Sequence, residues 1–213
     1  MSGVRRPHTI QAVVLDYGKV LCNAPTQEQV ERIAGVFHVD HERFWELYEK
    51  NRILYDRGDL TPHEYWSRFA EGTACRIDGD TVERLQTWDV EMWGSLDHSM
   101  VQWAARLRAQ GYKTGILSNL HSRFVRELRD SSAWLRHFDS QMFSSEVRLA
   151  KPDAAIFRLC LDSLELNGRD VLFVDDRQPN VDAARREGIT AICFRSREQL
   201  RTELNEIDFD VLP

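Results

Sequence analysis

Residues 12–21 read AVVLDYGKVL. The short apolar run at residues 12–15, followed directly by Asp16, decides the predicted fold. Short runs that are apolar throughout are typical of strands buried on both faces of a parallel sheet. Three later runs share this pattern and are also followed by polar residues: 114–117, 171–174 and 190–194. Because helical patterns separate these later runs, the sequence predicts an α/β fold with a Rossmann-like doubly wound parallel sheet core.

The segment from residue 23 to residue 96 differs because helical periodicity runs through it without a strand-like run. Its clearest helix start is TPHE at residues 61–64, a capping box with proline at the first helical position. We therefore predict an inserted α-helical cap domain at residues 23–96, and a catalytic core made of residues 1–22 and 97–213. Four of the six tryptophans lie in the insert. We expect them mainly to form its core, the alternative being that one or two line a substrate pocket.

The composition favours a cytoplasmic protein and disfavours some classes of partner. The net charge of -6 and the pI near 5.7 disfavour nucleic-acid or membrane-surface partners. The four cysteines have no C-x-x-C spacing, so we expect reduced thiols. Arg5 and Arg6 precede only a short apolar run, and no run is long enough for a membrane span, so neither a leader nor an anchor is expected. Whether the protein is a monomer or a homodimer stays open.

Polar residues follow the predicted strands, and they are of the types that phosphoryl transfer needs. In chain order they are Asp16, Ser118-Asn119, Lys151 after a loop, and Asp175-Asp176. Because the carboxyl ends of parallel strands share one edge of a sheet, we expect these side chains to converge. Each alone has an ordinary structural explanation as a turn, a helix cap or a solvated lysine. Together they supply a nucleophile, phosphate-binding groups and an acidic pair for a metal.

The four stretches VVLDYGKVL, GILSNL, LAKPD and FVDDRQPNVDAARREGI resemble, in order and spacing, the motifs of the haloacid dehalogenase superfamily. The resemblance covers the whole chain, including a helical cap after the first motif. Within the superfamily the chain is most similar to bacterial glucose 1-phosphate type phosphatases and to the phosphatase domain of soluble epoxide hydrolases. The resemblance implies a magnesium-dependent phosphatase that cleaves a small phosphorylated metabolite through an aspartyl-phosphate intermediate.

The same resemblance implies roles for individual residues. Asp16 would be the nucleophile, and Ser118, the Asn119 backbone N–H and Lys151 would hold the phosphoryl oxygens. Mg²⁺ would be held by the Asp16 carboxylate, the Gly18 carbonyl oxygen and Asp176, with Asp175 assisting. Three further residues are candidates for substrate binding: Lys19, His121 and Asn180, the last of which stands where many relatives carry another acid. Solvent exposure or a nearby acid is an equally good explanation of Lys19, and His121 also fits a bystander role.

The sequence departs from the usual pattern at Gly18, where most phosphatases of the superfamily carry a second aspartate for acid–base catalysis. Such help is worth about 10²–10⁴ in rate, although the glucose 1-phosphate type also tends to have glycine there. Two alternatives follow: a metal-free 2-haloacid dehalogenase, and a catalytically weak or silent ligand-binding member of the superfamily. The pair Asp175-Asp176 disfavours the dehalogenase, which needs no metal. A phosphorylation receiver is disfavoured because its acidic pair ends the first strand.

Overall fold

The core is a parallel β-sheet. The computed structural model describes residues 10–213, so the first nine residues of the predicted core, including Arg5 and Arg6, lie outside the described residues. Within the described part, five parallel strands pair in the order β3-β2-β1-β4-β5. Their bounds are Ala12–Leu15 (β1), Lys113–Ser118 (β2), Ser140–Phe143 (β3), Val171–Asp175 (β4) and Thr190–Cys193 (β5). The predicted fold class and its four strands are confirmed, and β3 is a strand that the sequence analysis missed.

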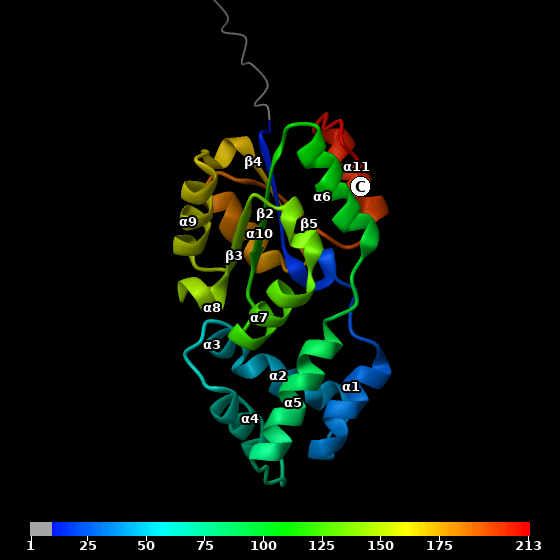
Figure 1. The fold of residues 1–213 in the computed structure, drawn as a ribbon, viewed down its shortest axis with the longest axis vertical. Coiled ribbons are helices and arrows are strands. Elements are labelled where there is room, and N and C mark those ends of the chain that lie inside the picture. The colour runs from blue at the N-terminus through cyan, green and yellow to red at the C-terminus, as the bar shows by residue number, and fades with distance from the viewer. Residues whose placement is uncertain (1–9) are drawn as a thin grey trace, which may run out of the picture.

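Helices cover both faces of this sheet (Figure 1). They are α6 (His98–Ala109), α7 (Ser122–Ser131), α8 (Ser144–Val147), α9 (Ala154–Leu164), α10 (Gln178–Arg186) and α11 (Arg197–Glu206). Successive side chains of a strand point to opposite faces. Accordingly Val13 and Leu15 pack with α6, α7 and α11, whereas Ala12 and Val14 pack with α9 and α10. The sheet is therefore buried on both sides, as its unbroken apolar strands predict.

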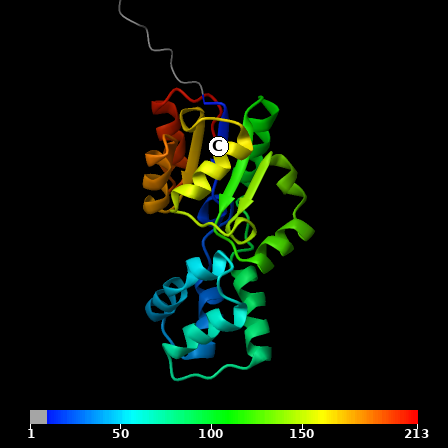
Figure 2. The same cartoon turned by 90° about the vertical axis from the view of Figure 1, so that its left-hand side faces the viewer.

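The cap is a separate group of helices at one end of the sheet (Figures 1 and 2). Its helices are α1 (Gln27–Ala34), α2 (His41–Lys50), α3 (Arg52–Asp56), α4 (Pro62–Glu71) and α5 (Gly79–Met92). They enclose an apolar cluster of their own, in which Trp66 is fully buried. Trp93 packs partly against this cluster and also lines a cavity. An antiparallel bridge between Cys22 and Leu96 joins the two connections to the core.

The start of α4 shows how local sequence fixes a cap helix. The Thr61 hydroxyl accepts a hydrogen bond from the Glu64 backbone N–H, and the Glu64 carboxylate accepts one from the Thr61 N–H. Pro62 occupies the first turn, where it removes no helical hydrogen bond. The predicted capping box is therefore confirmed. Among the described residues, none of the helices combines the length and apolar character needed to cross a membrane.

Candidate active site

The carboxyl ends of the three central strands bring the predicted catalytic residues together. Asp16 directly follows β1, Ser118 ends β2 and Asp175 ends β4. The register places Leu15 beside Ile116 on one side and beside Val174 on the other, so all three strands end at the same level. The side chains therefore meet at one edge of the sheet without any long loop.

The two carboxylate oxygens of Asp16 have different surroundings. Oδ1 accepts hydrogen bonds from the Ser118 hydroxyl at 2.7 Å and the Tyr17 backbone N–H at 2.7 Å, and it lies 2.8 Å from Lys151 Nζ. No hydrogen bond from a described residue reaches Oδ2. A Cβ atom placed on Gly18 would lie 4.0 Å from Oδ2 and close to nothing else. Oδ1 is thus anchored, while Oδ2 has no hydrogen-bond donor among the described residues and lies on the side of Gly18.

Lys151 is a buried cation held in place by Asn119. The Asn119 side chain donates to the Lys151 carbonyl oxygen at 2.8 Å and accepts from the Lys151 N–H at 2.9 Å. The ammonium group bridges Asp16 and Asp175, which lies 2.6 Å away. Burial lowers the pKa of Lys151, but these two carboxylates outweigh it and raise the pKa above its usual value. Lys151 therefore stays charged between the two carboxylates.

Asp175 and Asp176 differ in how much of their hydrogen-bonding capacity is used. Asp175 is fully buried and accepts from the Arg177 N–H, from the Asn180 amide at 2.9 Å and from Lys151. Asp176 has Lys19 as its neighbour, with 3.6 Å between the ammonium and the carboxylate. Burial and the charge of Asp175 raise the pKa of Asp176. Asp175 thus organises the loop, and Asp176 is the more available acid.

The acidic groups fit a divalent cation. Asp16, Asp175 and Asp176 each offer an oxygen, and these atoms all lie within 4.8 Å of one another. Burial raises the pKa of the Asp16 carboxyl to about 6, against the opposing charge of Lys151 and with added repulsion from Asp175 and Asp176. Carboxylate oxygens suit Mg²⁺, and a cation here would relieve that repulsion. Gly18, the remaining predicted ligand, lines the cavity next to this cluster.

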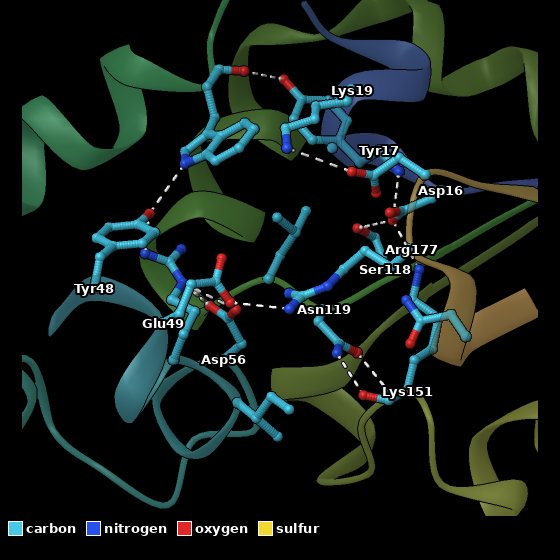
Figure 3. Close-up of a pocket in the computed structure, with 17 residues that line it drawn as sticks. Asp16, Tyr17, Lys19, Tyr48, Glu49, Asp56, Ser118, Asn119, Lys151 and Arg177 are labelled. Atoms are coloured by element: carbon cyan, nitrogen blue, oxygen red, sulfur yellow. Dashed lines mark hydrogen bonds and ion pairs between the residues drawn. The ribbon is translucent and has the colours of Figure 1, made fainter. Parts of the chain in front are cut away.

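A cavity of about 230 Å³ lies between this edge of the sheet and the cap. Lys19 and Asn180, which the sequence analysis proposed as candidates for substrate binding, lie on its core side. Its cap side is lined by Trp93 and by residues that the sequence analysis did not single out: Tyr48, Glu49, Arg52, Ile53 and Asp56. Figure 3 shows Glu49 reaching from the cap to Arg177 of the core, with 3.0 Å between the charged groups. The cap thus forms one wall of the cavity.

His121 is not where the sequence analysis expected it, because its side chain is buried away from the cavity lining. Its Nδ1 accepts from the Phe124 N–H at the start of α7. Its Nε2 lies 3.2 Å from Asp89 of the cap, and its ring stacks on Tyr55. The expectation of substrate contact is therefore corrected: as the N-cap of α7, the ring is turned toward the cap helices.

Asp89 belongs to a buried charged cluster that no motif had indicated. Arg52 donates through Nε to Asp56 at 3.0 Å and through Nη1 to Asp89 at 2.9 Å. The Tyr48 hydroxyl donates to Asp89 at 2.5 Å. Burial alone would raise the pKa of Asp89, but Arg52, His121 and Tyr48 hold it well below its usual value. Asp89 is therefore ionised in the folded protein.

A doubly wound sheet with an aspartate after the first strand, a lysine and an acidic pair at its carboxyl edge, and a helical cap defines a class of hydrolases. The sequence pattern of the haloacid dehalogenase-like hydrolases matches residues 9–188, so the chain belongs to this family. The resemblance seen in the motifs is thereby confirmed.

Among known relatives, drimenol cyclase drtB of Aspergillus calidoustus is 27% identical over 216 residues, covering 93% of this chain and 36% of that protein. Bifunctional epoxide hydrolase 2 of Rattus norvegicus is 30% identical over 118 residues, 53% of this chain and 21% of that protein. This chain thus spans about a third or less of either relative. Sesquiterpene phosphatase astK of Aspergillus oryzae is 22% identical, in an alignment that covers 93% of this chain and 97% of that protein.

Solved structures show the same fold. A HAD family enzyme from Bacteroides thetaiotaomicron, in complex with magnesium and inorganic phosphate, superposes with a TM-score of 0.71 at 19% identity, covering 87% of this chain and 94% of that one. L-2-haloacid dehalogenase from Xanthobacter autotrophicus superposes with a TM-score of 0.64 at 20% identity, covering 96% and 85%. Since both kinds of enzyme share the fold, the reaction has to be argued from the site.

Proposed function

We propose that this protein is a magnesium-dependent phosphatase that cleaves small phosphate monoesters through an aspartyl-phosphate on Asp16. The observation that carries the proposal is the asymmetry of Asp16. Its Oδ1 is anchored by Ser118, Tyr17 and Lys151, whereas its Oδ2 accepts no hydrogen bond from a described residue and lies beside Gly18, a residue of the cavity lining. A carboxylate fixed in this way is positioned as a nucleophile.

In the first step, Asp16 Oδ2 attacks phosphorus and the bond to the ester oxygen breaks. Ser118 and Lys151 already lie 2.7 and 2.8 Å from Asp16, so they are within reach of the phosphoryl oxygens and would stabilise their charge. Mg²⁺, when bound by Asp16 and the acidic pair, supplies further neutralisation of phosphoryl charge. The leaving oxygen takes its proton from water, because Gly18 provides no acid.

In the second step, water attacks the phosphorus of the aspartyl-phosphate, which releases inorganic phosphate and restores Asp16. Closure of the cap limits the water that reaches the intermediate. Asn119 acts indirectly in both steps, since its side chain fixes the backbone of Lys151. We assign it as a positioning residue in addition to the role proposed for its N–H.

Two of the similar proteins support a phosphatase. One is called a sesquiterpene phosphatase, and one structural neighbour holds magnesium with inorganic phosphate. A metal-free dehalogenase is the rival, because a structural neighbour is a 2-haloacid dehalogenase. The three carboxylates within 4.8 Å favour the phosphatase, since attack on a carbon–halogen bond has no use for a metal site.

The test is phosphate release from p-nitrophenyl phosphate and a panel of phosphate esters, with Mg²⁺ and with EDTA. We expect turnover that requires Mg²⁺ and returns when it is added back. Chloride release from 2-chloropropionate in EDTA would instead identify a dehalogenase. Absence of any turnover while inorganic phosphate still binds would identify a silent binding protein.

A further inference from the structure

The cap side of the cavity carries more negative than positive charge. Its charged lining residues are Glu49, Arg52 and Asp56, two acids and one base. Asp89, which is fully buried, lies directly behind Arg52 at 2.9 Å. Charges held in such a cavity act more strongly on a ligand than charges on an open surface.

The positive charge of Arg52 is already matched. Its Nε donates to both oxygens of Asp56 at 3.0 Å, and its Nη1 donates to Asp89 and to the Tyr48 hydroxyl. One guanidinium therefore faces two carboxylates. His121 approaches Asp89 from the core at 3.2 Å, but it lies outside the cavity lining.

The remaining cations around the cavity are also engaged, and they belong to the core. Arg177 pairs with Glu49 at 3.0 Å, and Lys19 lies 3.6 Å from Asp176. Lys151 bridges Asp16 and its acidic neighbour at the phosphate end. Within the described residues, the cap thus offers no unpaired cation to a second anionic group on the substrate.

The hydrogen bonds of Arg52 to the two carboxylates run through Nε and Nη1. No hydrogen bond from its Nη2 to a described residue accompanies those made by Nε and Nη1, and the side chain lines the cavity. Ile53 and Trp93 add apolar surface beside it. A neutral oxygen can accept from Nη2 without adding charge to a region that is already negative.

We infer that the cap selects phosphate esters whose leaving group is uncharged and carries a hydroxyl or carbonyl oxygen, with Arg52 as the specificity-determining donor. Carboxylated leaving groups are disfavoured by the excess negative charge around Arg52, where Asp56 and Asp89 face one guanidinium. This inference rests on the phosphatase activity proposed above and names its substrate class.

The experiment compares three esters of matched length: 3-hydroxypropyl phosphate, propyl phosphate and 3-phosphonooxypropanoate. The intrinsic reactivities of these esters are similar, so differences in kcat/KM report recognition. For the holoenzyme with Mg²⁺ we expect the hydroxyl ester to be used best. We expect the carboxylated ester to be at least about tenfold poorer, mainly through KM, as one unbalanced charge in a cavity implies.

Two variants remove negative charge from the cap side: Glu49→Gln at the half-exposed mouth and Asp56→Asn in the buried cluster. Each should raise the relative kcat/KM for the carboxylated ester several-fold. Asp162→Asn, an exposed acid on α9 far from the cavity lining, is the matched control and should leave the ratio unchanged. Glu49→Gln keeps the test valid if Asp56→Asn fails to fold.

The outcomes separate the two proposals. If the wild-type kcat/KM for the carboxylated ester equals that for the hydroxyl ester, the inference is overturned, while the proposed phosphatase activity stands. Equal use of the propyl and hydroxypropyl esters would overturn the donor role of Arg52. No turnover of any of the three esters, nor of p-nitrophenyl phosphate, would overturn the proposed function itself, and the inference with it.

Discussion

At Asp16 the difference between the two carboxylate oxygens leads to a mutational prediction. Asp16→Asn keeps the shape of the side chain, and its amide oxygen can still accept from Ser118 and the Tyr17 N–H, but it removes the nucleophile. We expect phosphate release to fall at least about a thousandfold. The measurement is kcat with p-nitrophenyl phosphate, beside Asp162→Asn as a charge-matched control. Retention of wild-type turnover would show that Asp16 is not the nucleophile.

Gly18 leads to a prediction of opposite sign. Its φ of -60° suits any residue, and a Cβ there would approach only Asp16 Oδ2, at 4.0 Å. Gly18→Asp therefore has room to place an acid beside the attacking oxygen, where it can protonate the leaving group. We expect kcat to rise, by up to the roughly 10²–10⁴ typical of acid–base catalysis.

Gly18→Asn is the control for this rise, because it has nearly the same shape but no proton to transfer. It should not exceed the wild type. An equal rise in both variants would mean that filling the space, and not acid catalysis, is responsible.

Single residues also show which side-chain positions the sequence can predict and which it cannot. We expected Asp16, Ser118 and Lys151 to meet because strand ends in a parallel sheet share an edge. In the structure the Ser118 hydroxyl and the Lys151 ammonium both lie within 2.8 Å of Asp16 Oδ1. His121 follows Ser118 by three positions, yet its side chain turns away to begin α7. Closeness along the chain does not fix the direction of a side chain.

Among the elements, β3 was missed for a physical reason. Its residues, SQMF, alternate polar and apolar only weakly, and its pairing to β2 alone makes it an edge strand. Because Ser140 and Gln141 are polar, β3 lacks the continuous apolar run by which the other four strands, including the opposite edge strand β5, were recognised. Its position depends on β2, and not on its own pattern.

The cap helix α4 supports a stability prediction. Thr61→Ala removes the hydroxyl that accepts from the Glu64 N–H, while the helix and its buried face stay the same. We expect a loss of about 1 kcal/mol in the free energy of unfolding. Urea denaturation measures it, and Thr61→Ser, which keeps the hydroxyl, should lose much less. A loss as large in Thr61→Ser would show that the methyl group, and not the cap, matters.

At the scale of the whole molecule, sequence patterns could not predict which cap residues line the cavity. Glu49, Arg52 and Asp56 have the spacing of ordinary helical residues. Which of them meets the cavity depends on how the cap docks on the core. One cap–core contact that fixes this docking is the hydrogen bond from Ser144 to the Asp56 carbonyl oxygen, at 2.6 Å.

The pairing of Asp89 with Arg52 and His121 joins cap to core, and it predicts how stability depends on pH. The folded pKa of Asp89 lies below the value of about 3.9 expected in the unfolded chain. The contribution of its charge is therefore fully present above that unfolded value, and it is lost as the pH falls below about 4 toward the folded pKa.

Asp89→Asn isolates this contribution, because Asp56, whose pKa is raised by burial, is present in both proteins. Removing the charge weakens the hydrogen bonds from Arg52 and the Tyr48 hydroxyl, while Asp56 still balances Arg52, so we expect a loss of about 2 kcal/mol at pH 7. The difference between wild type and variant should shrink as the pH is lowered to about 3, where the unfolded chain is protonated and the advantage of ionised Asp89 declines. Urea denaturation at several pH values measures this difference, with Asp162→Asn as the surface control. A difference that stays constant down to that pH would mean that Asp89 stabilises the junction through packing, and not through its charge.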